Sequence, residues 1–253
     1  MAAKRDKKPQ VTLLIPDCHR PYHDEYAWAL TLEIAAYYGV SRIVIGGDFA
    51  DFYSINGHGA KDPRLLALLK EEIKSVNDGL NELDTAFPGI PKTYIEGNHE
   101  FRLERFLISN ASALLGLVTC EGLFNIEHRK NWEYIPYGPH QKYNVPNTNL
   151  WGRHTPLASS ANATLRKAMC NFFYFHTHRL DEKKVVGFTR DFESFGSGWL
   201  GDSKYDVFNY VKGHDDWQQA FTLLWTYDDE PYYRITPEIV DRKCNIAGKV
   251  FKA

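Results

Sequence analysis

The sequence is poor in cysteine and has almost no excess of charge. Its four cysteines lie far apart and form no CxxC pair (Cys18, Cys120, Cys170 and Cys244). This spacing argues against a disulfide scaffold and against a clustered zinc site, so we expect reduced thiols. The formal net charge of -2 gives no global sign of a nucleic-acid or membrane partner, although it leaves room for a local basic patch.

Long apolar runs and linker-like stretches are also missing. No run approaches the length of a membrane span, and the basic start MAAKRDKKPQ lacks the apolar core of a signal peptide. We therefore expect a cytoplasmic protein without a membrane partner, in which residues 1–10 form a mobile basic tail. With no repeat and no internal low-complexity segment, residues 11–253 are interpreted as one domain of undetermined oligomeric state.

The residues that are present suit a globular α/β protein. Hydrophobic residues make up 43% of the chain and charged residues 25%. In the first half, buried-strand patterns at 11–15, 42–45 and 92–95 alternate with helical patterns at 24–38, 63–85 and 101–108. This β-α-β-α-β-α order predicts a parallel sheet covered by helices.

The second half has a different pattern. A helical segment at 158–169 precedes an apolar strand at 172–175, and from about residue 184 short strand patterns alternate with turn signals. We expect these later strands to form a second, antiparallel sheet packed against the first.

Residues that can bind metal ions follow the predicted strands. Each group comes directly after a strand: Asp17 and His19, then Asp48, then Asn98 and His99, then His176 and His178. Because loops at the carboxyl ends of parallel strands meet at one edge of a sheet, these side chains can converge. The spacing of two residues in each outer pair lets both members address one centre, since alternate residues of an extended chain point to the same side.

The mixed carboxylate, amide and imidazole donors indicate two divalent metal ions. Such donors favour manganese first, with iron, zinc, nickel or magnesium as alternatives, over calcium. Asp48 stands alone after two glycines and is the candidate to bridge the two ions. Two metals about 3.5–4 Å apart clamp a phosphate and activate a bound water.

The ordered motifs of this chain resemble those of the calcineurin-like metallophosphoesterases, especially the bacterial and bacteriophage members. The blocks are Asp17-Cys18-His19, Gly47-Asp48, Gly97-Asn98-His99-Glu100 and His176-Thr177-His178, and they span about residues 11–178. The resemblance implies a four-layer α/β/β/α sandwich of two mixed sheets. It also implies hydrolysis of a phosphate mono- or diester by attack of a metal-bound hydroxide, on a nucleotide, a nucleic acid or a small phosphoester.

The resemblance also assigns roles to individual residues. One metal would be held by Asp17, His19, Asp48 and His178, and the other by Asp48, Asn98, His176 and one further histidine. The imidazole of His99 would contact the phosphate and protonate the leaving oxygen. Glu100 would orient His99.

Two positions depart from the family pattern. The place of the further histidine holds Trp151, so His154 is the candidate ligand in its stead. Phe175 stands where the family has a glycine before HxH, and we expect a locally altered rim there.

Several other residues have a simpler interpretation. We interpret Asp51 as a loop or helix-start residue, and Cys18 as packing away from the metals. Arg102 and Arg105 are expected on a solvated face or paired with Glu100 or Glu104, with phosphate binding as the alternative. The aromatic stretch from Phe192 to Trp217 favours strand core over stacking on a nucleobase. Five isolated histidines are expected to be structural or on the surface: His23, His58, His128, His140 and His214.

Two other functions stay open at this point. A DNA or RNA nuclease could use the same dinuclear site, and it predicts a basic groove leading to the metals. Alternatively, a catalytically impaired member of the family could act as a binding scaffold, although His99 and Asp48 are both retained.

Overall fold

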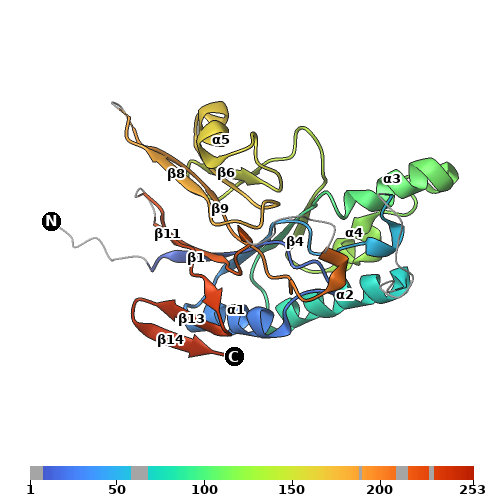
Figure 1. The fold of residues 1–253 in the computed structure, drawn as a ribbon, viewed down its shortest axis with the longest axis horizontal. Helices are drawn as coiled ribbons and strands as arrows, with labels where there is room; N and C mark the ends of the chain where they lie inside the picture. Colours follow the sequence, from blue (N-terminus) through green and yellow to red (C-terminus); the bar gives the residue numbers. More distant parts are fainter. Residues whose placement is uncertain (1–7, 58–67, 188–189, 209–215, 228–230) are drawn as a thin grey trace.

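The computed structural model describes residues 8–57, 68–187, 190–208, 216–227 and 231–253 (Figure 1). Residues 1–7 of the expected tail, together with His58 and His214, lie outside the described residues. The expected tail is one residue too long, because Gln10 already begins the first strand.

The first sheet has six strands in the order β11-β10-β1-β2-β3-β4. Four of them pair in parallel: β1 (Gln10–Ile15), β2 (Arg42–Ile45), β3 (Lys92–Ile95) and β4 (Trp132–Ile135). Two antiparallel strands, β10 (Thr222–Thr226) and β11 (Tyr233–Ile235), extend the sheet beyond β1. The parallel β-α order predicted from the first half of the sequence is therefore confirmed.

The second sheet has five strands in the order β5-β6-β7-β9-β8. They are β5 (Tyr143–Asn144), β6 (Leu150–Arg153), β7 (Asn171–Tyr174), β8 (Glu182–Val185) and β9 (Phe192–Gly196). The expectation of an antiparallel sheet is wrong, because β6, β7 and β9 pair in parallel and only the two edge strands run antiparallel. It is also wrong for β10 and β11, which join the first sheet.

The position of β10 follows from its burial on both faces. Leu223 packs in the core beneath the helices and Leu224 packs between the two sheets, and both are fully buried. A strand that is apolar on both sides needs cover on both sides, and the place beside β1 provides it.

Helices cover the outer face of each sheet. The first sheet is covered by α1 (Glu25–Tyr37), α2 (Leu69–Ala86), α3 (Phe101–Asn110) and the short α4 (Cys120–Leu123). The second sheet is covered by α5 (Ala161–Ala168). Among the described residues, short 3-10 turns in the connections include η1 (Tyr53–Ile55), η2 (Ser112–Leu114), η3 (Ile126–His128) and η4 (Asp206–Phe208). The four-layer α/β/β/α sandwich of two mixed sheets is thus confirmed (Figure 1).

Residues 239–252 form a small third sheet. It consists of β12 (Ile239–Val240), β13 (Lys243–Ile246) and β14 (Lys249–Lys252), and Phe251 joins the core beside α1. The last of the strand patterns expected after residue 184, at 238–241, therefore belongs to this separate three-stranded sheet.

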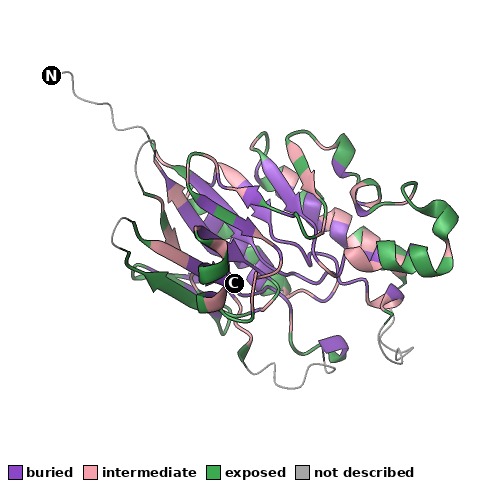
Figure 2. Ribbon diagram, turned by 90° about the horizontal axis from the view of Figure 1, so that it is seen from above, coloured by how far each residue is buried: buried purple, intermediate pink, exposed green. Residues whose placement is uncertain are grey.

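The layer between the two sheets fixes their relative position. Leu14 and Val44 from the first sheet meet Phe173 and Phe195 from the second, and all four are at most 1% exposed. Each buried side chain of this size contributes about 1.5–3 kcal/mol to folding. The buried strands at the centre and the exposed outer helices are visible in Figure 2. This packing brings the loops at the ends of both sheets to one edge of the sandwich.

The helix boundaries follow from local signals. The carboxylate of Asp24 accepts the backbone N–H groups of Tyr26 and Ala27 and so caps the start of α1. Gly39, with φ +65°, follows its end, as predicted from the sequence. The helix predicted over 63–85 is observed from Leu69, and part of its predicted start lies outside the described residues.

Candidate metal centre

The loops that follow strands of both sheets meet in one buried cluster. Loops of the first sheet carry Asp17, His19, Asp48, Asn98 and His99, and loops of the second sheet carry His154, His176 and His178. Across the cluster, Nε2 of His19 lies 3.1 Å from Nε2 of His178. Every site residue predicted from the sequence therefore lies in this cluster, which needs both sheets for its assembly.

One donor group consists of Asp17, His19 and His178, all buried. Nε2 of His178 is 3.4 Å from Oδ1 of Asp17, in addition to its approach to His19. Burial, followed by the charge of His99, lowers the pKa of His19. A neutral His19 whose Nδ1 lies against a carboxylate keeps the Nε2 lone pair for a cation.

The second donor group consists of Asp48, His154 and His176. Nε2 of His154 lies 2.9 Å from Oδ1 of Asn98 and 3.3 Å from Oδ2 of Asp48. Nδ1 of His154 donates to the carbonyl oxygen of Gly46 at 2.8 Å, the kind of second contact that orients metal-binding imidazoles. The structure therefore brings His154 to the centre, whereas Trp151 is 37% exposed on β6.

The charges in the second group influence one another. Burial opposes a charge on His154, but the carboxylate of Asp48 outweighs it and raises the pKa of His154 to about 9. Burial and the neighbouring charge of His154 lower the pKa of His176 to about 4. The side chain of His176 is the exposed member of the group.

These donor sets fit two divalent cations. The two Nε2 atoms of His19 and His178 face each other, and two lone pairs at 3.1 Å require a proton or a metal ion between them. Nδ1 of His178 is buried and has no hydrogen-bond partner among the described residues. Imidazole, carboxylate and amide donors together suit borderline divalent metals.

Backbone strain marks the same positions. Four non-glycine residues of the cluster have left-handed backbone conformations: His19 (φ 54°), Asp48 (φ 47°), His176 (φ 69°) and His178 (φ 60°). Each such residue costs about 1–3 kcal/mol and persists only where the surroundings enforce it. Concentrated strain of this kind is typical of a functional site.

Asp51 has a larger role than the sequence suggested. Its Oδ2 lies 2.9 Å from Nδ1 of His19 and 3.2 Å from Nδ1 of His99. Burial favours the neutral acid, but the charge of His99 and the hydrogen bond from His19 outweigh it and hold the pKa of Asp51 far below its usual value. Asp51 does lie in a loop just before η1, as interpreted from the sequence, but its buried carboxylate also contacts two imidazoles at once. The short distance from Asp48 along the chain was the one sequence signal that could have placed Asp51 at the site.

The carboxylate of Glu100 makes no hydrogen bond to His99, so the role expected for Glu100 is wrong. Its two carboxylate oxygens accept four backbone N–H groups and one hydroxyl: those of Asp48, Phe49, Ala50 and Gly97, and that of Tyr94. This carboxylate thereby joins the loop after β2 to the loop after β3. A side chain at Gly97 would overlap the backbone of Asp48, so this close approach requires glycine.

Arg102 also differs from its expected place. It faces the centre, where one guanidinium nitrogen donates to the carbonyl oxygen of Asp51 at 2.8 Å and the other lies 2.9 Å from Nε2 of His99. No pairing of Arg102 with Glu100 or Glu104 is found among the described contacts. Arg105, three residues along α3, is exposed as expected.

The aromatic stretch divides into two parts. Phe192 and Phe195 lie in β9, as the strand-core interpretation predicts. Trp199, Phe208 and Trp217 do belong to a buried cluster, but they lie outside the strands and pack against the histidines of the first donor group. Side chains beyond β9 are brought there because the chain after that strand returns past the loop of β1.

Phe175 does not alter the rim of the site. Its side chain is 1% exposed and lies in the core between the sheets, against the backbone of Gly46. A side chain at Gly46 would overlap the ring of Phe175, so glycine on one loop compensates for the missing glycine on the other. Cys18 is fully buried away from the donors, with Sγ 3.4 Å from the carbonyl oxygen of Pro16, as expected.

The remaining expectations concern residues away from the centre. His128 and His140 are exposed and His23 is partly buried, and none of them joins the cluster. All four cysteines are free. Among the described residues, no helix combines the length and the apolar character that crossing a bilayer requires.

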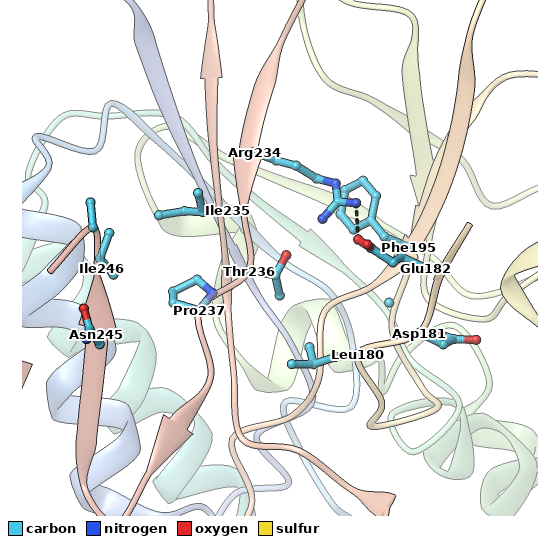
Figure 3. Close-up of a pocket in the computed structure, with 12 residues that line it drawn as sticks. Leu180, Asp181, Glu182, Phe195, Arg234, Ile235, Thr236, Pro237, Asn245 and Ile246 are labelled. Carbon is cyan, nitrogen blue, oxygen red and sulfur yellow. Dashed lines mark hydrogen bonds and ion pairs between the residues drawn. The ribbon is translucent and has the colours of Figure 1, made fainter. Parts of the chain in front are cut away.

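A cavity of about 360 Å³ lies between β9, β11 and β13, lined by residues such as Leu180, Thr236 and Ile246 (Figure 3). Its cation, Arg234, already pairs with Glu182 at 2.6 Å and with Glu193 at 3.0 Å. This cavity contains none of the donor residues, and its neutralised arginine does not favour an anionic ligand.

The comparison with solved structures supports the fold. The chain is similar to Vacuolar Protein Sorting 29 from Cryptosporidium parvum, with 12% identity and a TM-score of 0.50 over 98% of this chain and 100% of that chain. It also matches the Escherichia coli phosphoesterase YfcE, with 15% identity and a TM-score of 0.38 over 89% of this chain and 98% of that chain. A third match is the Pseudomonas putida nuclease MPE, with 10% identity and a TM-score of 0.39 over 96% and 86% of the two chains.

No curated protein matches the sequence. The family model for calcineurin-like phosphoesterases, by contrast, matches residues 11–243 and so includes every donor residue of the cluster. The order of the motifs, the sandwich of two mixed sheets and the buried histidine and aspartate groups agree with this match. The chain belongs to the calcineurin-like phosphoesterase family.

Proposed function

We propose that this protein is a metal-dependent phosphoesterase that hydrolyses a nucleotide, a nucleic acid or a small phosphoester with two divalent cations. The observation that carries the proposal is the pair of donor groups on facing loops, Asp17–His19–His178 and Asp48–His154–His176. In this proposal Asp48 serves both cations, and Asn98 completes the second set. Manganese is the first candidate, with iron, zinc, nickel or magnesium as alternatives.

When bound, two such cations polarise the phosphoryl oxygens and lower the pKa of bound water. The protein's own part is to hold the donors in place and to deliver a proton. Burial opposes a charge on His99, but the carboxylates of Asp48 and Asp51 outweigh it and raise the pKa of His99. Once protonated on Nε2, His99, oriented through Nδ1 by Asp51, can give that proton to the leaving oxygen.

Metal content and hydrolysis, measured together, test this proposal. The substrates are p-nitrophenyl phosphate and bis-p-nitrophenyl phosphate with added manganese, and the variants are Asp48→Asn, His99→Ala and His154→Ala. We expect about two metals per chain in the wild type, with loss of metal in the first and third variants. His99→Ala should keep its metals and lose activity by a factor of about 10² or more.

The pattern of results separates the alternatives. Preference for the diester, extended to cleavage of single-stranded DNA, would favour the nuclease. A wild-type protein that binds no metal would contradict the proposal and favour the binding scaffold. Two bound metals with both chromogenic esters uncleaved would instead indicate a more selective substrate, to be sought among nucleotides.

A further inference from the structure

The guanidinium group of Arg102 caps the reactive nitrogen of His99. One of its terminal nitrogens lies 2.9 Å from Nε2 of His99, and the other donates to the carbonyl oxygen of Asp51 at 2.8 Å. Arginine donates hydrogen bonds but does not accept them. In this arrangement Nε2 of His99 is therefore the acceptor, and the N–H of the imidazole is on Nδ1, against Asp51.

This tautomer is opposite to the one that proton donation requires. A histidine that protonates a leaving oxygen must carry its proton on Nε2, with the oxygen at hydrogen-bond distance. The guanidinium nitrogen now lies at that distance from Nε2 and so takes the place of the oxygen. A phosphoester can contact His99 only after Arg102 has left it.

The charge of Arg102 is available for a new partner. Its contact with the carboxylate of Asp51, at 3.4 Å, is long, and that carboxylate already serves His19 and His99. Arg20 follows His19 along the chain but turns away, towards Glu82 on α2. Arg102 itself is 13% exposed at the side chain, so part of it reaches solvent at the site.

We propose that Arg102 is a substrate-binding residue that exchanges His99 for the phosphoryl group when the ester binds. Its planar guanidinium matches two non-bridging oxygens, and its departure leaves Nε2 of His99 free to take up a proton from water and give it to the leaving oxygen. A monoester carries a second negative charge that a diester lacks, so Arg102 favours monoesters. This inference rests on the proposed function, because it concerns the ligand of the same site.

The test compares Arg102→Ala and Arg102→Lys with Arg105→Ala, an exposed arginine on the same helix. The assays measure kcat and KM on the two chromogenic esters with manganese, and inhibition by inorganic phosphate. Arg102→Ala should raise KM for p-nitrophenyl phosphate and weaken phosphate inhibition, each by about tenfold or more. Bis-p-nitrophenyl phosphate should be affected less, Arg102→Lys should fall in between, and Arg105→Ala should match the wild type.

The inference would be overturned if the substitution of Arg102 changed kcat and left substrate binding unchanged. If Arg102→Ala lowers kcat but leaves KM and phosphate inhibition unchanged, the arginine only positions His99. Calorimetric titration of the zinc-loaded proteins with inorganic phosphate keeps this result separate from the proposed function. Phosphate binding that needs Arg102 in a protein without esterase activity supports the inference and contradicts the function. Esterase activity with unchanged phosphate affinity in Arg102→Ala supports the proposed function and contradicts the inference. A wild type that binds no phosphate also overturns the inference.

Discussion

The indole ring of Trp199 lies parallel to the imidazole ring of His178, with ring centroids 5.1 Å apart and planes inclined by 15°. Trp217 meets the same imidazole edge-on, with centroids 4.2 Å apart. Imidazoles that bind metals usually donate their second nitrogen to an acceptor, but Nδ1 of His178 has none among the described residues. Aromatic packing therefore sets the orientation of this ring.

Replacing Trp199 should consequently weaken metal binding. Trp199→Leu removes the stacked face of His178, and we expect metal affinity to fall by about tenfold or more, as for other contacts that support ligands. Calorimetric titration with zinc measures the change. Trp151→Leu, on the exposed side of β6, is the control and should bind metal like the wild type. Unchanged affinity in Trp199→Leu would show that the stacking contributes to stability alone.

Asp51 should matter for catalysis as much as for metal binding. In Asp51→Asn the side chain is neutral, so the imidazoles of His19 and His99 lose the charge that holds their Nδ1–H groups. We expect kcat to fall by about 10²-fold or more, with a smaller loss of bound metal. Steady-state kinetics beside metal analysis separate the two effects. Asp78→Asn, on the exposed side of α2, is the matched control, and equal activity of the two variants would rule out this role.

Glu100 should be essential for folding. An ionised carboxylate can accept all five of its donors, whereas the amide of Glu100→Gln would place an N–H group against backbone N–H groups. We expect a loss of about 3 kcal/mol or more in the free energy of unfolding. Urea denaturation of the metal-free proteins measures it, with the exposed Glu104→Gln as control. A loss below about 1 kcal/mol would mean that the two loops are held together by other contacts.

Glu72 should make stability depend on pH. Its carboxylate accepts a hydrogen bond from the hydroxyl of Ser54, but burial, assisted by the charge of Asp51, raises the pKa of Glu72 to about 7. The folded protein therefore binds this proton more tightly than the unfolded chain, for which the ordinary value is 4.5. Stability is full below that value and declines as pH rises through it, by up to about 3 kcal/mol, until the decline ends above pH 7.

The variant Glu72→Gln removes this titration. Its melting temperature should fall less than that of the wild type between pH 5 and pH 8. Glu33→Gln, on the exposed side of α1, should keep the wild-type profile. Parallel profiles for Glu72→Gln and the wild type would assign the pH dependence to other groups.

The sequence was sufficient to predict the strands of the first half and the donors that follow them. Hydrophobic runs ending at Asp17 and Asp48 are local signals, and the geometry of a parallel sheet converts them into one cluster. The pairing of β10 could not be read in the same way, because TLLWT shows that both faces are buried but not what covers them. Sheet membership depends on distant layers of the fold.

Side-chain partners at the centre were the least predictable part. Glu100 accepts backbone groups about fifty residues away in sequence, and the partners of Asp51 come from two further loops. Arg102 could be assigned to a helix, but the side of that helix facing His99 depends on how α3 leaves the loop. The ring of Phe175 fills the space left by the missing side chain of Gly46 on the other sheet. Neither position alone reveals this pairing.

The carboxylate of Glu100 holds one side of the centre in place, whereas the side formed by His176 has fewer such contacts. Asp48 and Asn98 stand on loops tied together by that carboxylate, whereas the exposed His176 approaches from the other sheet and is held by the hydrogen bond of its backbone N–H to Asp17. If two cations bind as proposed, the His176 side of the centre would adapt to their radius more readily than the side that Glu100 holds. Ion exchange would then proceed from the His176 side and leave the contacts of Glu100 intact.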